Sequence, residues 1–373
     1  MQRVYFDNAA TTPLSKEVAD VMHEANKEVF GNPSSIHSFG RSARAKIEIA
    51  RKNIANSINA DSNEIIFTSS GTEANNSIFH CAINDLGIER IITSKIEHYA
   101  VLNPILKFTK QIQVDYVEVD NNGDINLNQL QNLLSDKRKT LVSLMHVNNE
   151  IGNILPIEKV ASICKEKNAL FHSDTVQSIA YFDIDVKKLD IDFLSCSAHK
   201  FHGPKGVGFF FIKSTHNISP FIKGGNQEKG LRAGTENTVG VIGLEKALLN
   251  VKVDKEIKLN KLYELKAYLI YKLEENKFDF SINGNLNESS PAILNVSFKT
   301  NNDVSMLLFN LDLEGVAISG GSACTSGSNK GSHVLKQIGT PMNQPAIRIS
   351  FSMYNTKKEI DRLIKVFEKL LLK

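Results

Sequence analysis

One lysine stands out among the residues that could do chemistry, because of the sequence around it. Lys200 follows the apolar run 191–194 and the segment Ser195-Cys196-Ser197-Ala198-His199, and a Gly-Pro-Lys-Gly turn comes shortly after it. Short apolar runs bounded by glycine and proline predict buried strands, so we expect Lys200 at the end of an interior strand. Low solvation there lowers the pKa of an amine, and only a neutral amine attacks a carbonyl to form a Schiff base. Taken alone, the segment also fits a lysine that caps a strand and points into water.

Two further segments, taken together with this lysine, predict a cofactor site. Ser70-Gly71-Thr72-Glu73 is a strand-to-helix turn whose backbone N–H groups and helix dipole suit a phosphate, although a plain helix cap at Thr72 fits equally well. Asp174 follows the apolar run 170–173, and Gln177 comes three residues later. A phosphate turn, an aspartate and a strand-end lysine, in this order in one domain, are typical of a pyridoxal phosphate site. There the aspartate keeps the pyridine nitrogen protonated, so that the ring can accept electrons.

Three other residues could take part in the same chemistry. His98 follows an expected strand and could stack on a flat cofactor and shuttle protons, although a lone histidine is more often a surface residue. Asn149 could hydrogen-bond a ring substituent or a carboxylate, or could simply belong to a turn. Cys324 lies among small residues in the segment 319–328, which predicts a mobile loop. A nucleophilic thiolate that must carry its product elsewhere needs such mobility, and an incidental loop cysteine is the alternative.

The elements that position these residues predict an α/β fold. Apolar runs that read as strands alternate with helical patterns, which indicates a mostly parallel, seven-stranded sheet covered by helices on both faces. The expected strands span 65–68, 91–94, 114–119, 141–146, 170–173, 193–195 and 207–211. In such sheets ligands bind beyond the carboxyl ends of the strands, where the polar motifs of this chain lie.

The sequence after the sheet changes character and predicts a smaller α+β C-terminal domain. We expect a large cofactor-binding domain over 13–250 and a small domain made of 1–12 plus 251–373. The cysteine loop, about 319–332, would belong to the small domain. A long helical stretch at about 253–275 leads into it, and a capping box of Thr356 with Glu359 begins the last helix.

Composition narrows the setting of this chemistry. The chain has 373 residues and a net charge of +3, which predicts neither nucleic-acid nor membrane binding. Its cysteines, Cys81, Cys164, Cys196 and Cys324, are scattered and form no C-x-x-C pair, so we expect reduced thiols, no metal site and a cytoplasmic protein. The first three lie in helix or strand patterns and are expected to be buried packing residues.

Several stretches together resemble one known family over nearly the whole length. The chain is similar to cysteine desulfurases of the NifS/IscS type, within the class V aminotransferase-like, fold type I pyridoxal phosphate enzymes. The matching stretches are Asp7-Asn8-Ala9-Ala10-Thr11-Thr12-Pro13, Gly31-Asn32-Pro33-Ser34-Ser35, 68–73, Glu97-His98, 145–152, Ser197-Ala198-His199-Lys200 and Arg232-Ala233-Gly234-Thr235-Glu236-Asn237.

The resemblance implies a role for each matching residue in cofactor binding. Lys200 would be the Schiff-base lysine, His98 would stack on the ring and handle protons, and Asp174 would pair with the pyridine nitrogen. The other residues expected to bind pyridoxal 5'-phosphate are Gly71, Thr72, Asn149, Gln177, Ser197, His199 and Thr235. In relatives the equivalent of Thr235 reaches the phosphate of the neighbouring subunit, which implies a homodimer.

The resemblance also implies a substrate and a reaction. Asn149, Arg348 and Asn32 would bind L-cysteine, and a buried-looking arginine such as Arg348 suits a bidentate carboxylate. Cys324 would take the sulfur as a persulfide, leave L-alanine, and pass the sulfur to an acceptor such as an iron–sulfur scaffold protein, or toward tRNA thiolation.

Two departures from the family pattern concern the acceptor rather than the chemistry. The loop resembles the long-loop group I enzymes, but Gly320-Gly321 stands where Ser-Gly is common, and the chain stops at Lys373, without the longer tail that helps to dock the scaffold. Selenocysteine lysis or another class V reaction remains an alternative function, and a catalytically idle assembly scaffold on this fold is a second one.

Overall fold

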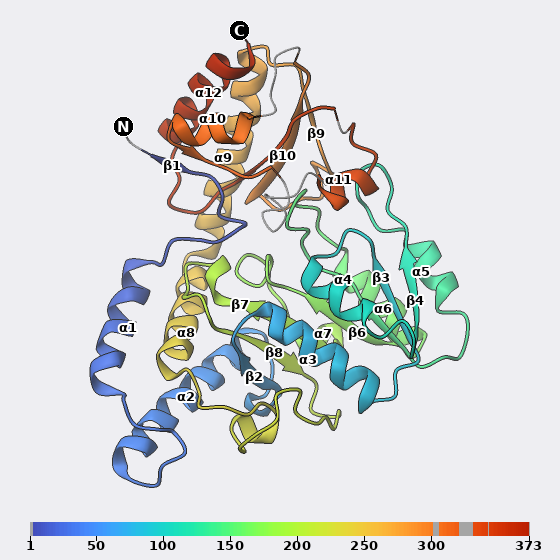
Figure 1. Ribbon diagram of the computed structural model, residues 1–373, viewed down its shortest axis with the longest axis vertical. Helices are drawn as coiled ribbons and strands as arrows, with labels where there is room; N and C mark the ends of the chain where they lie inside the picture. The colour runs from blue at the N-terminus through green and yellow to red at the C-terminus, as the bar shows by residue number, and fades with distance from the viewer. Residues whose placement is uncertain (1–2, 301–305, 321–330, 342, 373) are drawn as a thin grey trace.

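The computed structural model describes residues 3–300, 306–320, 331–341 and 343–372, and is built around one seven-stranded sheet (Figure 1). Its strands, in spatial order, are β2 (Ile65–Thr68), β8 (Gly208–Ile212), β7 (Phe193–Ser197), β6 (Leu170–Asp174), β5 (Thr140–Ser143), β3 (Arg90–Ser94) and β4 (Gln113–Val117). Only β8 runs antiparallel to its neighbours, β2 and β7, within this sheet. The predicted mostly parallel, seven-stranded α/β sheet is confirmed.

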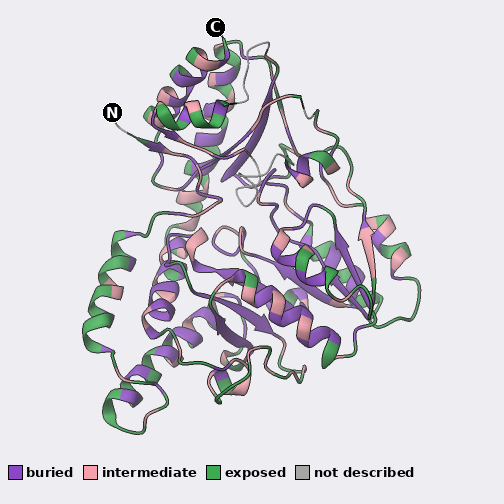
Figure 2. Ribbon diagram, in the orientation of Figure 1, coloured by how far each residue is buried: buried purple, intermediate pink, exposed green. Residues whose placement is uncertain are grey.

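Helices cover the sheet on both faces. They are α1 (Lys16–Glu28), α2 (Ser38–Ser57), α3 (Gly71–Asn84), α4 (Tyr99–Leu106), α5 (Leu127–Leu133), α6 (Ile157–Glu166), α7 (Val186–Leu189) and α8 (Thr238–Lys252). Successive strand residues point to opposite faces, so Phe210 of β8 packs into one buried cluster with α3 and α4, while Phe209 and Phe211 pack into the other with α2, α6 and α8. The sheet is therefore buried on both sides, as Figure 2 shows.

A second, smaller layer of secondary structure follows the sheet. The strands β9 (Phe280–Ile282), β10 (Ile293–Phe298) and β12 (Ala346–Ser350) form an antiparallel sheet with β10 in the middle. Helices α9 (Lys255–Glu275), α10 (Leu307–Leu313) and α12 (Lys357–Leu371) lie with it (Figure 1), and α11 (His333–Gln337) stands apart from them, nearer the large sheet. Residues of α9, α10 and α12 share one buried cluster with the small sheet, which gives this part a core of its own.

The N-terminal arm crosses from the large sheet to this smaller part. Strand β1 (Val4–Tyr5) pairs in parallel with β11 (Val316–Ala317), and the arm then passes the small sheet at Asp7 before α1 begins. The predicted capping box is present, because Thr356 Oγ1 accepts from the backbone N–H of Glu359 and the carboxylate of Glu359 accepts in return from Thr356 N–H. The division into 13–250 and 1–12 plus 251–373 stays a prediction.

Some boundaries differ from those expected. The long helix expected at about 253–275 is present as α9, and α8, which was not expected, ends just before it, where Asp254 adopts a left-handed backbone (φ 49°). Helix α2 begins at Ser38, because the ring of His37 accepts from Gly40 N–H and caps it. No helix of the described residues is long and apolar enough to cross a membrane.

Candidate active site

A cavity of about 230 Å³ lies beyond the carboxyl ends of the parallel strands, where the small sheet faces the large one. Most residues predicted to bind cofactor or substrate line it, although they come from distant parts of the sequence. They are Gly71, Thr72, His98, Asn149, Asp174, Gln177, Ser197, His199, Lys200 and Arg348. Strands β3, β5, β6 and β7 deliver most of these groups, and β12 of the small sheet delivers the arginine. The carboxyl edge of a parallel sheet is the expected place for a ligand.

Lys200 lies just beyond the C-terminal end of strand β7, as the sequence around it predicted. The strand ends at Ser197, and a single 3₁₀ turn, Ala198–Lys200, carries the lysine over the sheet edge. Its ammonium donates to two backbone carbonyls of the N-terminal arm, Ala9 O at 2.7 Å and Ala10 O at 2.8 Å. The arm therefore holds the amine over the cavity, and the predicted lowering of its pKa stays a prediction.

Asp174 ends strand β6 and is almost fully buried. One carboxylate oxygen accepts from the side-chain amide of Asn75 at 2.8 Å, and the other accepts from Val176 N–H at 3.0 Å. Two donors therefore fix the orientation of the carboxylate. Sequence reasoning missed Asn75, although its place one turn into the helix that follows the phosphate turn was a usable signal.

The turn before α3 has the geometry of an anion site. The helix begins at Gly71, and the hydroxyl of Ser70 caps it by accepting from Glu73 N–H at 3.2 Å. A Cβ on Gly71 would lie 2.7 Å from a methyl group of Val176, so this close approach of backbone to the cavity requires glycine. A helix N-terminus of this length favours negative charge.

His199 lies beside this turn, on the 3₁₀ segment that also carries the lysine. Its Nδ1 is 3.1 Å from the hydroxyl of Thr11. Burial, together with the charges of Lys200 and Lys205, lowers the pKa of the imidazole to about 4. His199 is therefore a neutral hydrogen-bonding group near pH 7.

These features fit pyridoxal 5'-phosphate. A helix N-terminus with small residues can hold the phosphate, Asp174 is held where a ring nitrogen could meet it, and the amine of Lys200 lies in the same cavity. Gln177 lines the cavity as well, with its amide donating to Ala9 O at 2.8 Å.

His98 caps helix α4 and lines the cavity above the sheet edge. Its Nδ1 accepts from Ala100 N–H at 3.0 Å, which keeps that nitrogen without a proton and leaves proton exchange to Nε2. Burial lowers the pKa of this imidazole, whereas the charge of Asp174 opposes the shift. A neutral imidazole is thus the resting form.

Arg348 enters the cavity from strand β12 and is buried, as predicted. Its guanidinium already has partners: Nη1 donates to Asn149 O, and Nη2 donates to a carboxylate oxygen of Asp7, both at 2.8 Å. Asp7 of the N-terminal arm therefore already supplies one carboxylate oxygen to this arginine, while its Nε has no hydrogen-bond partner among the described residues. Sequence reasoning did not foresee this ion pair.

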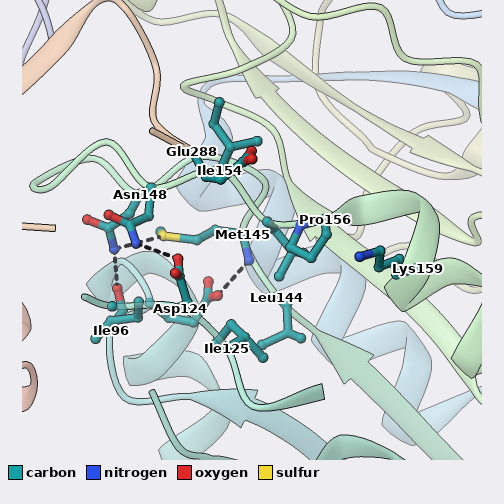
Figure 3. Close-up of a pocket in the computed structure, with 14 residues that line it drawn as sticks. Ile96, Asp124, Ile125, Leu144, Met145, Asn148, Ile154, Pro156, Lys159 and Glu288 are labelled. Carbon is teal, nitrogen blue, oxygen red and sulfur yellow. Dashed lines mark hydrogen bonds between the residues drawn. The ribbon is translucent and has the colours of Figure 1, made fainter. Parts of the chain in front are cut away.

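Met145 separates the site from a second cavity of about 360 Å³, since it lines both. Figure 3 shows Asn148 holding this wall, with its amide donating to Ile96 O and to the sulfur of Met145. Glu97 lines the second cavity and accepts from Met145 N–H at 2.6 Å. Burial raises the pKa of its carboxyl well above the usual range, whereas the hydrogen bond from Met145 N–H opposes this shift.

Three predicted residues are not in the described cavity. Thr235 is exposed on the loop before α8, where it lines a separate hollow. Asn32 is exposed between α1 and α2 and accepts from Ser34 N–H at 2.9 Å. Cys324 lies outside the described residues. The other three cysteines, Cys81, Cys164 and Cys196, are buried and unpaired, as predicted.

Comparison with known proteins places this fold and site in a family. The model for class V aminotransferases matches residues 4–363. The cysteine desulfurase IscS of Dictyoglomus turgidum is 45% identical over 380 residues, which cover all of this chain and 95% of the relative. A solved NifS-like protein superposes with a TM-score of 0.91 at 38% identity, over 99% of each chain. A structure described as SspA in complex with cysteine is 33% identical, with a TM-score of 0.82, over 95% of this chain and all of that one.

The chain therefore belongs to the class V aminotransferases, a family of enzymes that use pyridoxal 5'-phosphate. Within them its place is with the cysteine desulfurases of the IscS and NifS type. The resemblance noted in the sequence is confirmed over the full length of the chain.

Proposed function

We propose that this protein removes the sulfur of L-cysteine, releases L-alanine and leaves a persulfide on Cys324. One observation carries the proposal: a single cavity brings together the amine of Lys200, the carboxylate of Asp174 and the imidazole of His98. Pyridoxal phosphate, when bound, supplies an electron sink for the pair released at the substrate α-carbon. All other steps fall to side chains of this chain.

Proton transfer is assigned to two groups. The Nζ of Lys200 takes the α-proton, and the Ala9 and Ala10 carbonyls keep the amine in the cavity while it does so. His98 gives and takes protons at Nε2, because its Nδ1 is occupied by Ala100 N–H. Its lowered pKa favours the neutral, proton-accepting form near pH 7.

Substrate orientation is assigned to Arg348 and Asn149. Each terminal nitrogen of the guanidinium makes one hydrogen bond with a described residue, so a substrate carboxylate can share the arginine with Asp7 or displace it. Asn32 would join them from outside the described cavity.

Sulfur abstraction is assigned to the thiolate of Cys324. It attacks the substrate sulfur, a sulfur–sulfur bond forms and the carbon–sulfur bond of the substrate breaks. The electron pair of the broken bond stays with the carbon fragment, which gains protons and leaves as alanine. The outer sulfur atom of the persulfide is then transferred to a thiol of an acceptor protein, such as an iron–sulfur scaffold or a carrier for tRNA thiolation, and Cys324 is left as a thiolate. Because the three described cysteines form no disulfide, we place this chemistry in the cytoplasm.

The active unit is proposed to be a homodimer. Phe30, Ile36 and Phe39 expose large apolar surfaces around the loop that carries Asn32, and the rings of Phe30 and Phe39 lie 5.0 Å apart. A second copy would cover this patch and would bring Asn32 and Thr235 toward a neighbouring cavity. The two-part division at residue 250 would then separate a dimerising, cofactor-binding part from the part that carries Cys324.

The function is tested with the full chain loaded with pyridoxal phosphate. Incubation with L-cysteine and a reducing thiol should release alanine and sulfide in equal amounts, and L-selenocysteine serves as the comparison substrate. Alanine release from L-cysteine at less than a hundredth of the rate from L-selenocysteine would favour a selenocysteine lyase. Transfer of the substrate amino group to an oxo acid, without sulfide, would reassign the chain to the aminotransferases.

A further inference from the structure

Glu73 brings a negative charge to the turn that is expected to hold the phosphate. It stands in the first turn of α3, two residues after Gly71. Its carboxylate accepts from the backbone N–H of Ser69 at 2.8 Å, and the hydroxyl of Ser70 accepts from Glu73 N–H at 3.2 Å. This arrangement is similar to a capping box and stabilises the start of the helix. The same carboxylate repels any anion that binds at this helix N-terminus.

Arg232 pairs with this carboxylate from a distant part of the sequence. It lies in the loop between β8 and α8, which also carries Thr235. Its Nε donates to one oxygen of Glu73 at 2.8 Å, and its Nη2 donates to the other at 3.2 Å. The two side chains are 22% and 9% exposed, so water screens this bidentate pair only in part. Burial raises the pKa of the Glu73 carboxyl, but the hydrogen bonds from Arg232 and Ser69 bring it below its usual value.

We propose that Arg232 is a positioning residue for the cofactor phosphate, because it neutralises Glu73 beside the N-terminus of α3. It acts through Glu73, since neither residue is among the described residues that line the active-site cavity. The inference rests on the function proposed above only in its need for pyridoxal phosphate, with the phosphate bound at Gly71.

Two other carboxylates lie near the guanidinium. The hydrogen bond to Glu73 raises the pKa of Arg232, burial opposes this rise, and the charges of Glu228 and Glu236 add to it. Glu228 already has a bidentate partner in the buried Arg51, with contacts of 2.7 and 2.8 Å. Of the three acids, Glu73 is the one that stands on the turn before α3, so its charge matters most to an anion bound there.

The loop around Arg232 has contacts that do not use the guanidinium. Ala233 N–H donates to Ile222 O at 3.1 Å, and Gly234 N–H donates to the side chain of Gln227 at 3.0 Å. We therefore expect the loop to keep its place when the charge of Arg232 is removed, so that the electrostatic effect can be measured by itself.

The size of this effect follows from the distance between the charges. Ser69, whose N–H the carboxylate accepts, lies two residues before Gly71, so the carboxylate and a phosphate at Gly71 are about 8 Å apart. At an effective dielectric constant of about 20, two unit charges at this separation change a Kd roughly 30-fold. Partial exposure of the pair and salt reduce this value, so we expect a change of at least about fivefold.

The test compares two forms of the cofactor that differ only in the phosphate. Absorbance titration of the cofactor-free protein, without L-cysteine, gives the Kd of pyridoxal phosphate and that of pyridoxal. Both form the same bond with Lys200, so the ratio of the two Kd values isolates the phosphate. The variants are Arg232→Met, Glu73→Gln and their double. The matched control is Lys213→Met, which removes a partly buried cation paired with Asp190 at the end of β8 that lies away from the cavity.

In Arg232→Met the Kd of pyridoxal phosphate should rise at least fivefold, while that of pyridoxal stays within twofold of the parent. The double variant should return to within twofold of the parent, because both charges are then gone. Lys213→Met should bind both forms like the parent. A double variant as weak as Arg232→Met, an equal loss for pyridoxal, or an equal loss in Lys213→Met would overturn the proposal.

Glu73→Gln keeps Arg232 and the size of the side chain, and it should bind pyridoxal phosphate at least twofold more tightly than the parent. Loss of a merely structural ion pair would weaken binding instead, so the sign of this change decides the question even if Arg232→Met fails to fold. Raising KCl from about 0.05 M to about 0.5 M should at least halve the ratio of the Arg232→Met and parent Kd values, because salt screens the unpaired carboxylate. A ratio that does not respond to salt would refute the electrostatic role.

These binding measurements are independent of sulfur chemistry. If the parent releases no alanine from L-cysteine but the Kd differences are present, the proposed function fails and the role of Arg232 stands. Alanine release by the parent, with equal Kd values in all variants, refutes the role of Arg232 and leaves the proposed function intact.

Discussion

The side-chain amide of Asn75 donates a hydrogen bond of 2.8 Å to the carboxylate of Asp174, and both residues are buried. This contact ties helix α3, whose N-terminus is expected to hold the phosphate, to the strand that carries the expected partner of the pyridine nitrogen. The hydrogen bond keeps the N-terminus of α3 and the carboxylate of Asp174 at a fixed distance, although they lie on separate elements. A ligand that needs both ends at once benefits from that fixed distance.

Replacing Asn75 should weaken cofactor binding without changing the fold. In Asn75→Ala the carboxylate of Asp174 loses one of its two fixed donors, which costs about 1–2 kcal/mol and should raise the Kd for pyridoxal phosphate about 5–30-fold. Absorbance titration of the cofactor-free protein measures this. The control is Asn76→Ala on the same helix, because the Asn76 amide donates to Thr72 O within that helix. This variant should bind the cofactor like the parent. Equal affinities in both variants would argue against the role of Asn75.

Lys200 should be the residue that holds the cofactor covalently. Borohydride reduction of the loaded parent should fix the cofactor to the peptide that contains Lys200, and mass spectrometry of a digest locates it. Lys200→Ala should yield no fixed cofactor, whereas Lys205→Ala, at an exposed lysine five residues on, should still yield it. Cofactor that stays trapped on the Lys200→Ala chain would disprove the assignment.

The residues that line the cavity could largely be predicted from the sequence, because most of them directly follow a predicted strand. Lys200, Asp174 and His98 each follow an apolar run, and parallel strands bring their carboxyl ends to one edge, so spacing in the sequence was enough. The sheet followed from the same runs. The antiparallel direction of β8 could not be predicted, because it depends on how the chain turns back after Lys200, and no local sequence pattern shows that turn.

The unpredicted part depends on contacts between elements that are far apart in the sequence. Asn75 points at Asp174 only because of how α3 packs on the sheet. His333 reaches Glu97 only because the small sheet places α11 at the cavity wall. Hydrophobic periodicity sets which face of an element is buried, but it does not set which polar group meets which. Such partners become visible only in the folded chain.

Two buried histidines predict a loss of stability in acid. Burial lowers the pKa of His146 to about 4 and that of His172 to about 3, whereas an unfolded chain titrates near 6.5. The unfolded state therefore binds protons first as the pH falls. The stability present above pH 6.5 is lost progressively toward pH 4, by about 3 kcal/mol for His146.

Chemical unfolding between pH 8 and pH 4.5 tests this dependence. His146→Phe removes one titrating ring and keeps its packing against Phe182, and no described residue hydrogen-bonds Nδ1 of His146. The variant should match the parent near pH 8 and lose less stability than the parent at pH 4.5. Parallel curves at all pH values would show that His146 does not contribute.

The proposed homodimer predicts that two different inactive variants restore activity when their subunits form mixed dimers. Lys200→Ala and Thr235→Val proteins should each be nearly inactive, but a mixed dimer holds one site with an intact lysine and an intact threonine. Subunit exchange should restore activity toward a quarter of the parent level, as random mixing gives half mixed dimers with one good site each. Exchange proven by mass spectrometry with no gain in activity would contradict shared sites.

Cys324 separates the two halves of the reaction. Cofactor binding, substrate binding and removal of the α-proton are assigned to Lys200, Asp174 and Arg348, and in the proposed mechanism only the sulfur-abstraction step needs a thiolate. Cys324→Ser keeps the size and polarity of the side chain, but an alcohol is hardly ionised near neutral pH and holds no persulfide. The variant should bind the cofactor and should show the same spectral change with L-cysteine as the parent.

Its alanine release should fall at least a hundredfold, and it should carry no sulfur that a second thiol can remove. Cys81→Ala is the control, because burial raises the pKa of that thiol to about 12 and keeps it unreactive, so its turnover should match that of the parent. Alanine production by Cys324→Ser near the parent rate would remove Cys324 from the mechanism, while the roles of Lys200 and Asp174 would stand. The chain would then have to release sulfur directly from the substrate, as an enzyme without a persulfide step does.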